Sequence, residues 1–323
     1  MIRLSRSVAI GLLSVIALTT SVLRAEQPPQ TRPGPVRLLV AGDNRGKPGF
    51  VDVLQAARKV SGDGVFAGVI TPGDADPVAA TRKQIASVFG VPAPDKPAPT
   101  WYPVVGNHEA ASPKEMAALR AYGKEALAKV TTAGPKGCGS TTYSFEAGRM
   151  HVVVLDQYWG GEDKEGGKVR GSAEVIPALR AWLEQDLKAA DQPYKIVVGH
   201  EPAYPQQDQD IHTGRHEESA LNRNPLARDA FWKVLEDQHV ALYICGHTHR
   251  YSRWRPDGSA VWQLDAAQAR NDSSWKYDAF VILTAAADGL KVDTYRQPNV
   301  QGTWAVTDSA AIPAAPTTTL PGN

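Results

Sequence analysis

Five short segments of the chain each place a glycine directly before an aspartate, an asparagine or a histidine. The side chains after these glycines offer carboxylate, amide and imidazole donors without any thiolate, a set that suits metals such as Mn, Fe or Zn. Two carboxylates, one amide oxygen and three imidazoles are enough for two ions if one carboxylate bridges them, and paired ions can activate water for phosphoryl transfer. The donors are Asp43, Asp74, Asn107, His200, His247 and His249.

Each of these segments follows a short apolar run that predicts a buried strand. The runs cover residues 36–41, 65–71, 102–105, 195–198 and 241–245, and further strands are expected at 142–145, at 151–155 and between 260 and 295. Apolar residues at helical spacing predict helices over 50–60, 175–187 and 225–235. Ligands of open α/β sheets bind at the carboxyl ends of strands, so five donors placed there favour one common site over unrelated turns.

The composition is that of an ordinary globular protein: of 323 residues, 42% are hydrophobic and 21% are charged. A net charge of +1 argues against a nucleic-acid partner, because surfaces that bind phosphate backbones carry a marked basic excess. Two cysteines exclude a disulfide scaffold and a thiolate zinc cluster. Cys138 and Cys245 could pair in an exported protein, or Cys245 could be a free thiol on a buried strand.

Residues 1–25 have the layout of a secretory signal peptide: Arg3 and Arg6 precede an apolar stretch, and a cleavage site is expected after Ala25. The apolar stretch is short for a membrane span, so we expect no stable span after cleavage, with an uncleaved anchor as the alternative. The predicted location is periplasmic or secreted. Residues 34–300 would form one catalytic domain, followed by a disordered Pro/Ala/Thr-rich tail over 301–323.

The five glycine segments stand in the order and at the spacing found in the calcineurin-like metallophosphoesterase superfamily, which this chain resembles over about residues 36–296. The stretches between the segments are similar to the purple acid phosphatase-like branch of that superfamily. The resemblance implies an α/β fold, a four-layer αββα sandwich with two mixed β-sheets and a dimetal site at the C-terminal ends of the strands. The motifs that carry it are Gly42-Asp43, Gly73-Asp74, Gly106-Asn107-His108-Glu109, Gly199-His200 and Gly246-His247-Thr248-His249.

The resemblance also implies roles for these residues. Two metal ions would share Asp74, with Asp43 and His249 completing one site and Asn107, His200 and His247 the other. A hydroxide that bridges the ions would attack phosphorus in line. His108 would be the catalytic residue that protonates the leaving group or stabilises the transition state; alternatively, it orients a neighbouring ligand.

The first motif departs from the family at Arg45, where an imidazole ligand is commoner. A guanidinium stays protonated and has no lone pair for a metal, so the first ion would lose a donor. Arg45 could instead bind the substrate phosphate through paired hydrogen bonds, or be a solvated loop residue. The long polar insertion over 204–224 could be a substrate lid, with His216 as a second substrate-binding candidate, or an exposed loop without a role.

These features predict an exported metal-dependent phosphoesterase that hydrolyses phosphomonoesters, with a small phosphorylated molecule as substrate. A phosphodiesterase, for instance one acting on cyclic nucleotides, could use the same centre. A third alternative is a non-catalytic protein that binds phosphate or another ligand, because the altered first motif weakens one metal position. The oligomeric state has no signature in the sequence.

Overall fold

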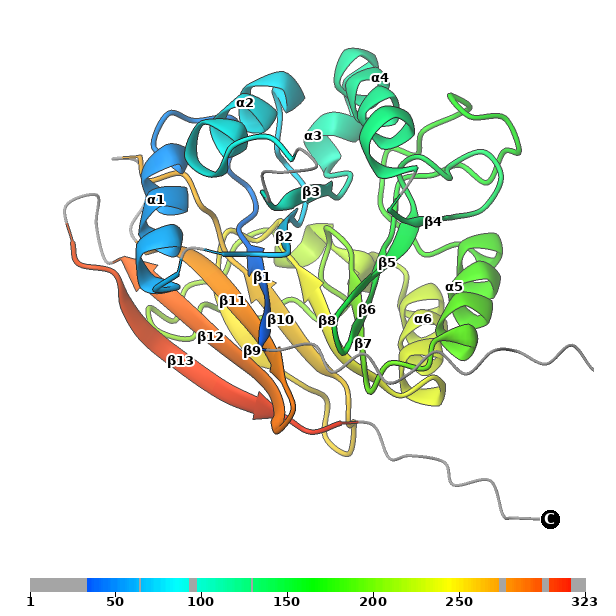
Figure 1. The fold of residues 1–323 in the computed structure, drawn as a ribbon. Coiled ribbons are helices and arrows are strands. Elements are labelled where there is room, and N and C mark those ends of the chain that lie inside the picture. The colour runs from blue at the N-terminus through cyan, green and yellow to red at the C-terminus, as the bar shows by residue number, and fades with distance from the viewer. Residues whose placement is uncertain are drawn as a thin grey trace, which may run out of the picture. The chain divides into compact units, whose positions relative to one another are not determined.

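Two mixed β-sheets lie face to face in the described part of the chain, with helices on their outer sides (Figure 1). The computed structural model describes residues 34–63, 65–92, 98–128, 130–272, 277–297 and 302–314. The predicted leader at 1–25 lies outside the described residues.

The first sheet has six strands in the order β13-β12-β11-β1-β2-β3. Its strands β1, β2 and β3 run parallel, whereas β11, β12 and β13 pair antiparallel with their neighbours. The parallel strands end at the same edge, where three of the glycine motifs begin. The bounds are β1 Val36–Val40, β2 Gly68–Thr71, β3 Thr100–Pro103, β11 Asp278–Ala286, β12 Gly289–Gln297 and β13 Ala305–Ile312.

The second sheet has seven strands in the order β4-β5-β6-β7-β8-β10-β9. Its central strands β6, β7, β8 and β10 are parallel, and the outer strands are antiparallel to their neighbours. The other two glycine motifs follow β7 and β8. The bounds are β4 Thr132–Ala133, β5 Tyr143–Ala147, β6 Met150–Val154, β7 Tyr194–Val198, β8 Val240–Cys245, β9 Tyr251–Trp254 and β10 Trp262–Ala266.

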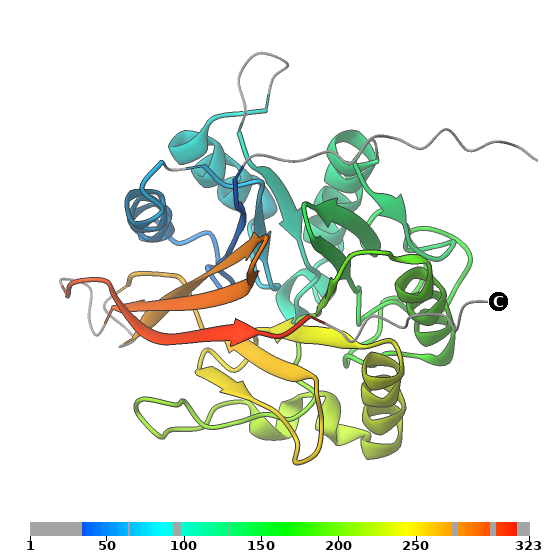
Figure 2. The ribbon, with the colours of Figure 1, turned by 60° about the horizontal axis from the view of Figure 1, so that its bottom comes forward.

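The helices complete the four layers that the resemblance implied, so this expectation is confirmed. Helices α1 (Phe50–Val60) and α2 (Val78–Phe89) pack on the first sheet, and α5 (Pro177–Ala189) and α6 (Pro225–Asp237) pack on the second (Figure 2). Shorter helical segments are α3 (Asn107–Ala110), α4 (Pro113–Tyr122), a π-turn (Gly123–Leu127) and two 3₁₀ turns (Glu217–Ser219 and Leu221–Arg223). None of the described helices is both long and apolar enough to cross a membrane.

The side chains of β6 show how the second sheet is held on both faces. Val152 and Val154 lie in the large core between the sheets, while Val153 and the following Leu155 pack against α5 and α6. All four are buried. This alternation is the period of a strand, and because both faces are covered the run is apolar throughout.

One expectation from the sequence is corrected, and one open alternative is decided. Residues 305–312, assigned to a disordered tail that begins at 301, form strand β13 on the edge of β12. Most of its side chains are exposed, so the side-chain pattern gave no signal. Backbone pairing with β12 holds the strand, together with the Asp308 carboxylate, which accepts hydrogen bonds from Tyr251 and Arg253. Cys138 and Cys245 do not pair: both are buried free thiols, and Cys245 Sγ lies 3.6 Å from the Leu264 carbonyl.

His151 on β6 ties two strands and a helix together through two carboxylates. Its Nδ1 donates to Glu146 Oε1 on β5 at 2.7 Å, and its Nε2 donates to Asp186 Oδ2 on α5 at 2.8 Å. Burial alone would lower the pKa of His151, but the hydrogen bonds to Asp186 and Glu146 outweigh it and raise the pKa to about 9. Both ring nitrogens donate, so the imidazolium is the stabilised form.

We expect the stability contributed by His151 to be complete below pH 6.5 and to be lost as the pH rises towards 9, because the folded chain holds this proton more tightly. His151→Gln should therefore reduce the free energy of unfolding by about 2 kcal/mol more at pH 6 than at pH 9.5, after allowance for solvent screening. Urea unfolding at the two pH values measures this difference. His239→Gln, at an exposed histidine, is the control, and an equal loss at both pH values would contradict the assignment.

Candidate metal centre

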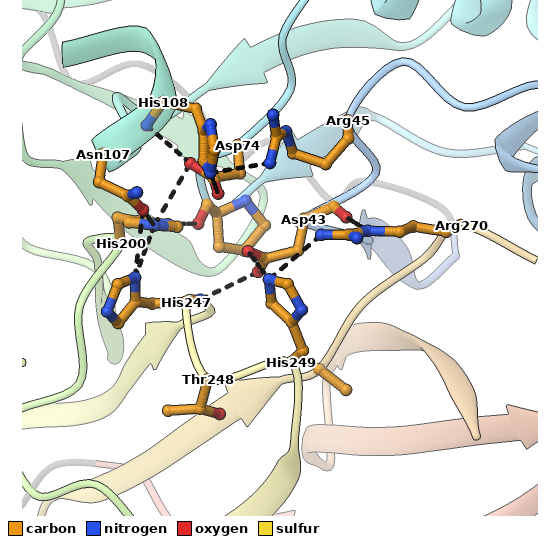
Figure 3. A network of polar contacts seen from close by, with 12 residues as sticks. Asp43, Arg45, Asp74, Asn107, His108, His200, His247, Thr248, His249 and Arg270 are labelled. Atoms are coloured by element: carbon orange, nitrogen blue, oxygen red, sulfur yellow. Dashed lines mark hydrogen bonds and ion pairs between the residues drawn. The ribbon is translucent and has the colours of Figure 1, made fainter. Parts of the chain in front are cut away.

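The six donors predicted from the sequence come together where the two sheets meet (Figure 3). The loops after β1, β2 and β3 of the first sheet bring three of them, and the loops after β7 and β8 of the second bring the rest. The carboxyl ends of parallel strands lie on one edge of a sheet, so each sheet gathers three donors, and the packing of the two sheets brings the two sets together. The donors are Asp43, Asp74 and Asn107, and His200, His247 and His249.

Three of these residues form a first position. Oxygens of Asp43 and Asp74 and a ring nitrogen of His249 all lie within 4.8 Å of one another. His249 Nε2 is 3.3 Å from Asp43 Oδ1, and Asp43 Oδ2 accepts a hydrogen bond from the His247 backbone at 3.0 Å. Asp43 Oδ1 is buried without a well-aligned hydrogen-bond donor. A buried carboxylate oxygen of this kind fits a bound cation.

The other three donors form a second position. Asn107 Oδ1 lies 2.9 Å from His200 Nε2 and 3.2 Å from His247 Nδ1, and the two ring nitrogens are 3.3 Å apart. Asp74 Oδ1 is 3.5 Å from His200 Nε2, which places Asp74 next to both positions. His200 Nδ1 donates to the Pro72 carbonyl at 2.7 Å, and this hydrogen bond directs Nε2 towards the other donors.

The backbone at this site is held in an unusual conformation. Asp43, Asp74, His247 and His249 have φ angles of 51°, 52°, 71° and 56°, in the left-handed region that most residues avoid. The glycine of the third motif has a steric reason: a Cβ on Gly106 would lie 2.3 Å from the Asp74 backbone nitrogen. The close approach between loops therefore explains why a glycine precedes the donor there.

Two buried carboxyls that sequence reasoning missed support the loops. Glu109 accepts hydrogen bonds from the backbone nitrogens of Asp74, Ala75 and Gly106 at 3.1, 2.6 and 2.9 Å. Burial, with the charges of Asp74 and Asp76, raises the pKa of Glu109 to about 8. Asp265, the second, accepts from Thr248 Oγ1 at 2.5 Å and so holds the loop between His247 and His249. Glu109 stands in the third motif, but its contacts are visible only in the fold.

The protonation states of the donors suit a metal. Burial opposes ionisation of Asp43, but nearby His249 and His200 outweigh it and hold its pKa below the usual range. Burial lowers the pKa of both His247 and His249, which keeps their imidazoles neutral. The pKa of His200 is lowered by burial but raised more strongly by Asp74 and Asp43, to about 9. Carboxylates and neutral imidazoles are the forms that bind metal ions. Asp43, His247 and His249 are therefore already in the binding form, whereas His200 would release a proton when a metal binds.

His108 and Arg45 lie at the solvent-facing side of the centre. His108 Nε2 is 3.5 Å from Asp74 Oδ2, and its side chain is 40% exposed. Arg45 Nη1 donates to His108 Nε2 at 2.7 Å, while Arg45 Nε donates to Asp76 Oδ1 at 2.6 Å. Asp76 had no predicted partner, and it orients the guanidinium. These hydrogen bonds hold the Arg45 guanidinium between Asp76 and His108.

The insertion over 204–224 reaches the centre. The His216 ring lies 5.0 Å from that of His247 and 5.9 Å from that of His249, measured between centroids. Ser219 accompanies it, with its carbonyl oxygen 3.0 Å from His247 Nε2. Residues 214–219 line an open cavity of about 730 Å³. The loop therefore lies against His247 and His249 of the fifth motif.

Arg270 is a site residue that sequence reasoning missed. It follows β10, which pairs parallel with β8, so its loop opens at the same edge as the fifth motif. Its Nε donates to the Asp43 carbonyl at 2.7 Å, and its Nη2 lies 3.2 Å from His249 Nε2 (Figure 3). The side chain is almost completely buried. The position of Arg270 after the end of a strand was the one signal in the sequence that could have identified it. No glycine motif marks the end of β10.

A family model for the calcineurin-like phosphoesterases matches residues 36–251, which include all six donors. The chain belongs to the calcineurin-like phosphoesterase family. The match runs from β1 to the start of β9 and includes the loops that carry all six donors, whereas strands β10 to β13 lie outside it.

Solved structures share this calcineurin-like fold at low identity. PhoD has a TM-score of 0.58 at 10% identity, with 87% of this chain and 70% of that chain covered. GAP50, the anchor in the inner membrane complex of Plasmodium, has 0.55 at 13%, with 89% and 91% covered. A purple acid phosphatase from yellow lupin (Lupinus luteus) seeds has 0.52 at 15%, with 90% and 58% covered. No curated protein sequence matches the chain.

Proposed function

We propose that this calcineurin-like phosphoesterase is an exported, metal-dependent phosphomonoesterase. The observation that carries the proposal is the convergence of Asn107, His200 and His247 beside Asp74, with ligand-atom distances of 2.9 to 3.5 Å. Export rests on the signal-peptide layout of residues 1–25.

The donors of the two positions would bind metal. The bound metal would act as a Lewis acid towards the phosphoryl oxygens and would lower the pKa of the water bound to it. Asp43 and Asp74 would balance its charge, and the hydrogen bond from His200 Nδ1 to Pro72 would keep the His200 ring in place. We retain Mn, Fe or Zn as the candidates, because the donors are oxygens and nitrogens.

His108 and Arg45 would act on the substrate from the solvent-facing side. The Arg45 guanidinium, held by Asp76, would bind the phosphate through its remaining donor capacity, as Arg does in paired hydrogen bonds. When a phosphate oxygen takes the Nη1 hydrogen bond, His108 Nε2 becomes available to carry a proton to the leaving-group oxygen. His216 would line the substrate entrance, because its exposed ring lies over His247 and His249.

Two alternatives have specific support. A diesterase could use the same donors, because they bind the metal and the phosphoryl group and not the ester. A non-catalytic ligand-binding protein is favoured by Arg45 and Arg270, which bring two guanidinium groups to a centre usually built from metal ligands. The likeness to GAP50, an anchor protein, is compatible with this second alternative.

Turnover of chromogenic esters by the purified chain tests the proposal. After removal of metal with a chelator and reconstitution with Mn²⁺, Zn²⁺ or Fe²⁺, we expect hydrolysis of p-nitrophenyl phosphate that exceeds hydrolysis of bis(p-nitrophenyl) phosphate by at least about tenfold in kcat/KM. Preference for the diester would favour the diesterase. A protein that binds phosphate in calorimetry but hydrolyses neither ester would support the binding protein and contradict the proposal.

A further inference from the structure

The guanidinium of Arg270 stands beside the first metal position. Its Nη2 lies 3.2 Å from His249 Nε2, and its Nε donates to the Asp43 carbonyl at 2.7 Å. It therefore contacts two of the three residues whose ligand atoms form this position. The contact with His249 is made at the same ring nitrogen that is 3.3 Å from Asp43 Oδ1.

A guanidinium at this place competes with an ion in two ways. It stays protonated and has only donors, so it uses the lone pair of His249 Nε2 that a metal would need. It also carries a positive charge at short range from the place of the ion, and in a buried site such repulsion is weakly screened.

The second position has different surroundings. Asn107, His200 and His247 lie within 3.3 Å of one another, and Asp74 is next to His200. Their other contacts are neutral: His200 Nδ1 donates to the Pro72 carbonyl, and His247 Nε2 faces the Ser219 carbonyl. These contacts orient the donors and leave their convergent atoms directed at a common point.

We propose that the positive charge of Arg270 replaces that of a metal ion at the first position. The centre would then hold one metal ion, at the second position. This inference rests on the proposed metal-dependent function and changes the number of ions expected from the family resemblance. Asp43 and His249 then hold Arg270, and Arg270 in turn supplies a fixed positive charge next to Asp43.

Metal stoichiometry tests the inference without measuring activity. Chains loaded with Mn²⁺ and freed of excess metal should contain about one ion in the wild type and about two in Arg270→Gln, because the neutral amide no longer repels the first ion. Electron paramagnetic resonance of the bound Mn²⁺ should show an isolated ion in the wild type and a spin-coupled pair in the variant. Arg270→Lys keeps the charge and should retain about one ion. Arg255→Gln, at an exposed arginine, is the control for purification.

The metal content of His249→Ala shows which position the ion occupies. This test remains valid even if Arg270→Gln fails to fold. In the wild-type background, His249→Ala should leave the content at about one ion, whereas His200→Ala should remove it. Two ions in the wild type, or loss of the single ion in His249→Ala, would overturn the inference and leave the proposed function standing. A wild type that takes up no ion under any condition would overturn the proposed function together with the inference.

Discussion

Asp74→Asn is expected to lower phosphomonoester hydrolysis by at least about a thousandfold, because the variant loses the carboxylate adjacent to both metal positions. Asp74 Oδ1 lies 3.5 Å from His200 Nε2 and accepts the His108 backbone hydrogen bond at 3.1 Å. Asparagine preserves the size of the side chain but removes its negative charge, so the metal should bind at least about tenfold more weakly. Metal content after dialysis and kcat with excess Mn²⁺ measure the two effects separately.

Asp76→Asn is the matched control for this prediction, because it makes the same change two residues away. The Asp76 carboxylate pairs with Arg45 and ligates nothing in the proposed centre. The control should retain the metal and change mainly KM. Asp74→Asn protein that keeps both its metal and its activity would show that the centre lies elsewhere.

His108→Ala is expected to lower kcat by about a hundredfold or more on an alkyl phosphate and by much less on p-nitrophenyl phosphate. A general acid matters most for a leaving group of high pKa, because that oxygen must receive a proton in the transition state, whereas nitrophenolate leaves unaided. His108 Nε2 lies at the solvent-facing side of the centre, 3.5 Å from Asp74 Oδ2, where a leaving group can exit. Steady-state kinetics on the two esters give the comparison.

Arg45→Ala separates substrate binding from proton transfer. Arg45 shares a hydrogen bond with His108, but its proposed role is to bind the phosphate, so its loss should raise KM by about tenfold for both esters alike. The metal content should remain unchanged.

If His108→Ala slows both esters equally, His108 is a positioning residue and not the proton donor.

Several features could be predicted from local sequence because their physical causes are local. Helix α1 has the predicted bounds, 50–60, because apolar residues recur at helical spacing and its core positions are buried. Strands β2 and β8, which precede two of the donor motifs, are buried along their whole length, and β1 is buried over its last three residues, which is why these segments are mostly apolar. The donors follow closely after their strands, so the pattern assigns them to the carboxyl ends of strands, but only the packing of the two sheets brings those ends together.

Other features depend on contacts between distant parts of the chain. β13 is held by the open edge of β12, and no pattern within 305–312 reveals that edge. Asp76 gained a partner only because the loops after β1 and β2 lie side by side. The sequence permitted a pairing of Cys138 with Cys245, and only the fold shows that both are buried free thiols.

The sequence by itself determined the donor types, their places after strands and the family, because a glycine followed by a ligand at a strand end is a local pattern. Only the tertiary structure decided the electrostatic environment of those donors. Arg270 is 227 residues from Asp43 in sequence, yet it donates to the Asp43 carbonyl and lies beside His249. The charge next to a metal position depends on distance in space, and the fold sets that distance when β10 pairs with β8.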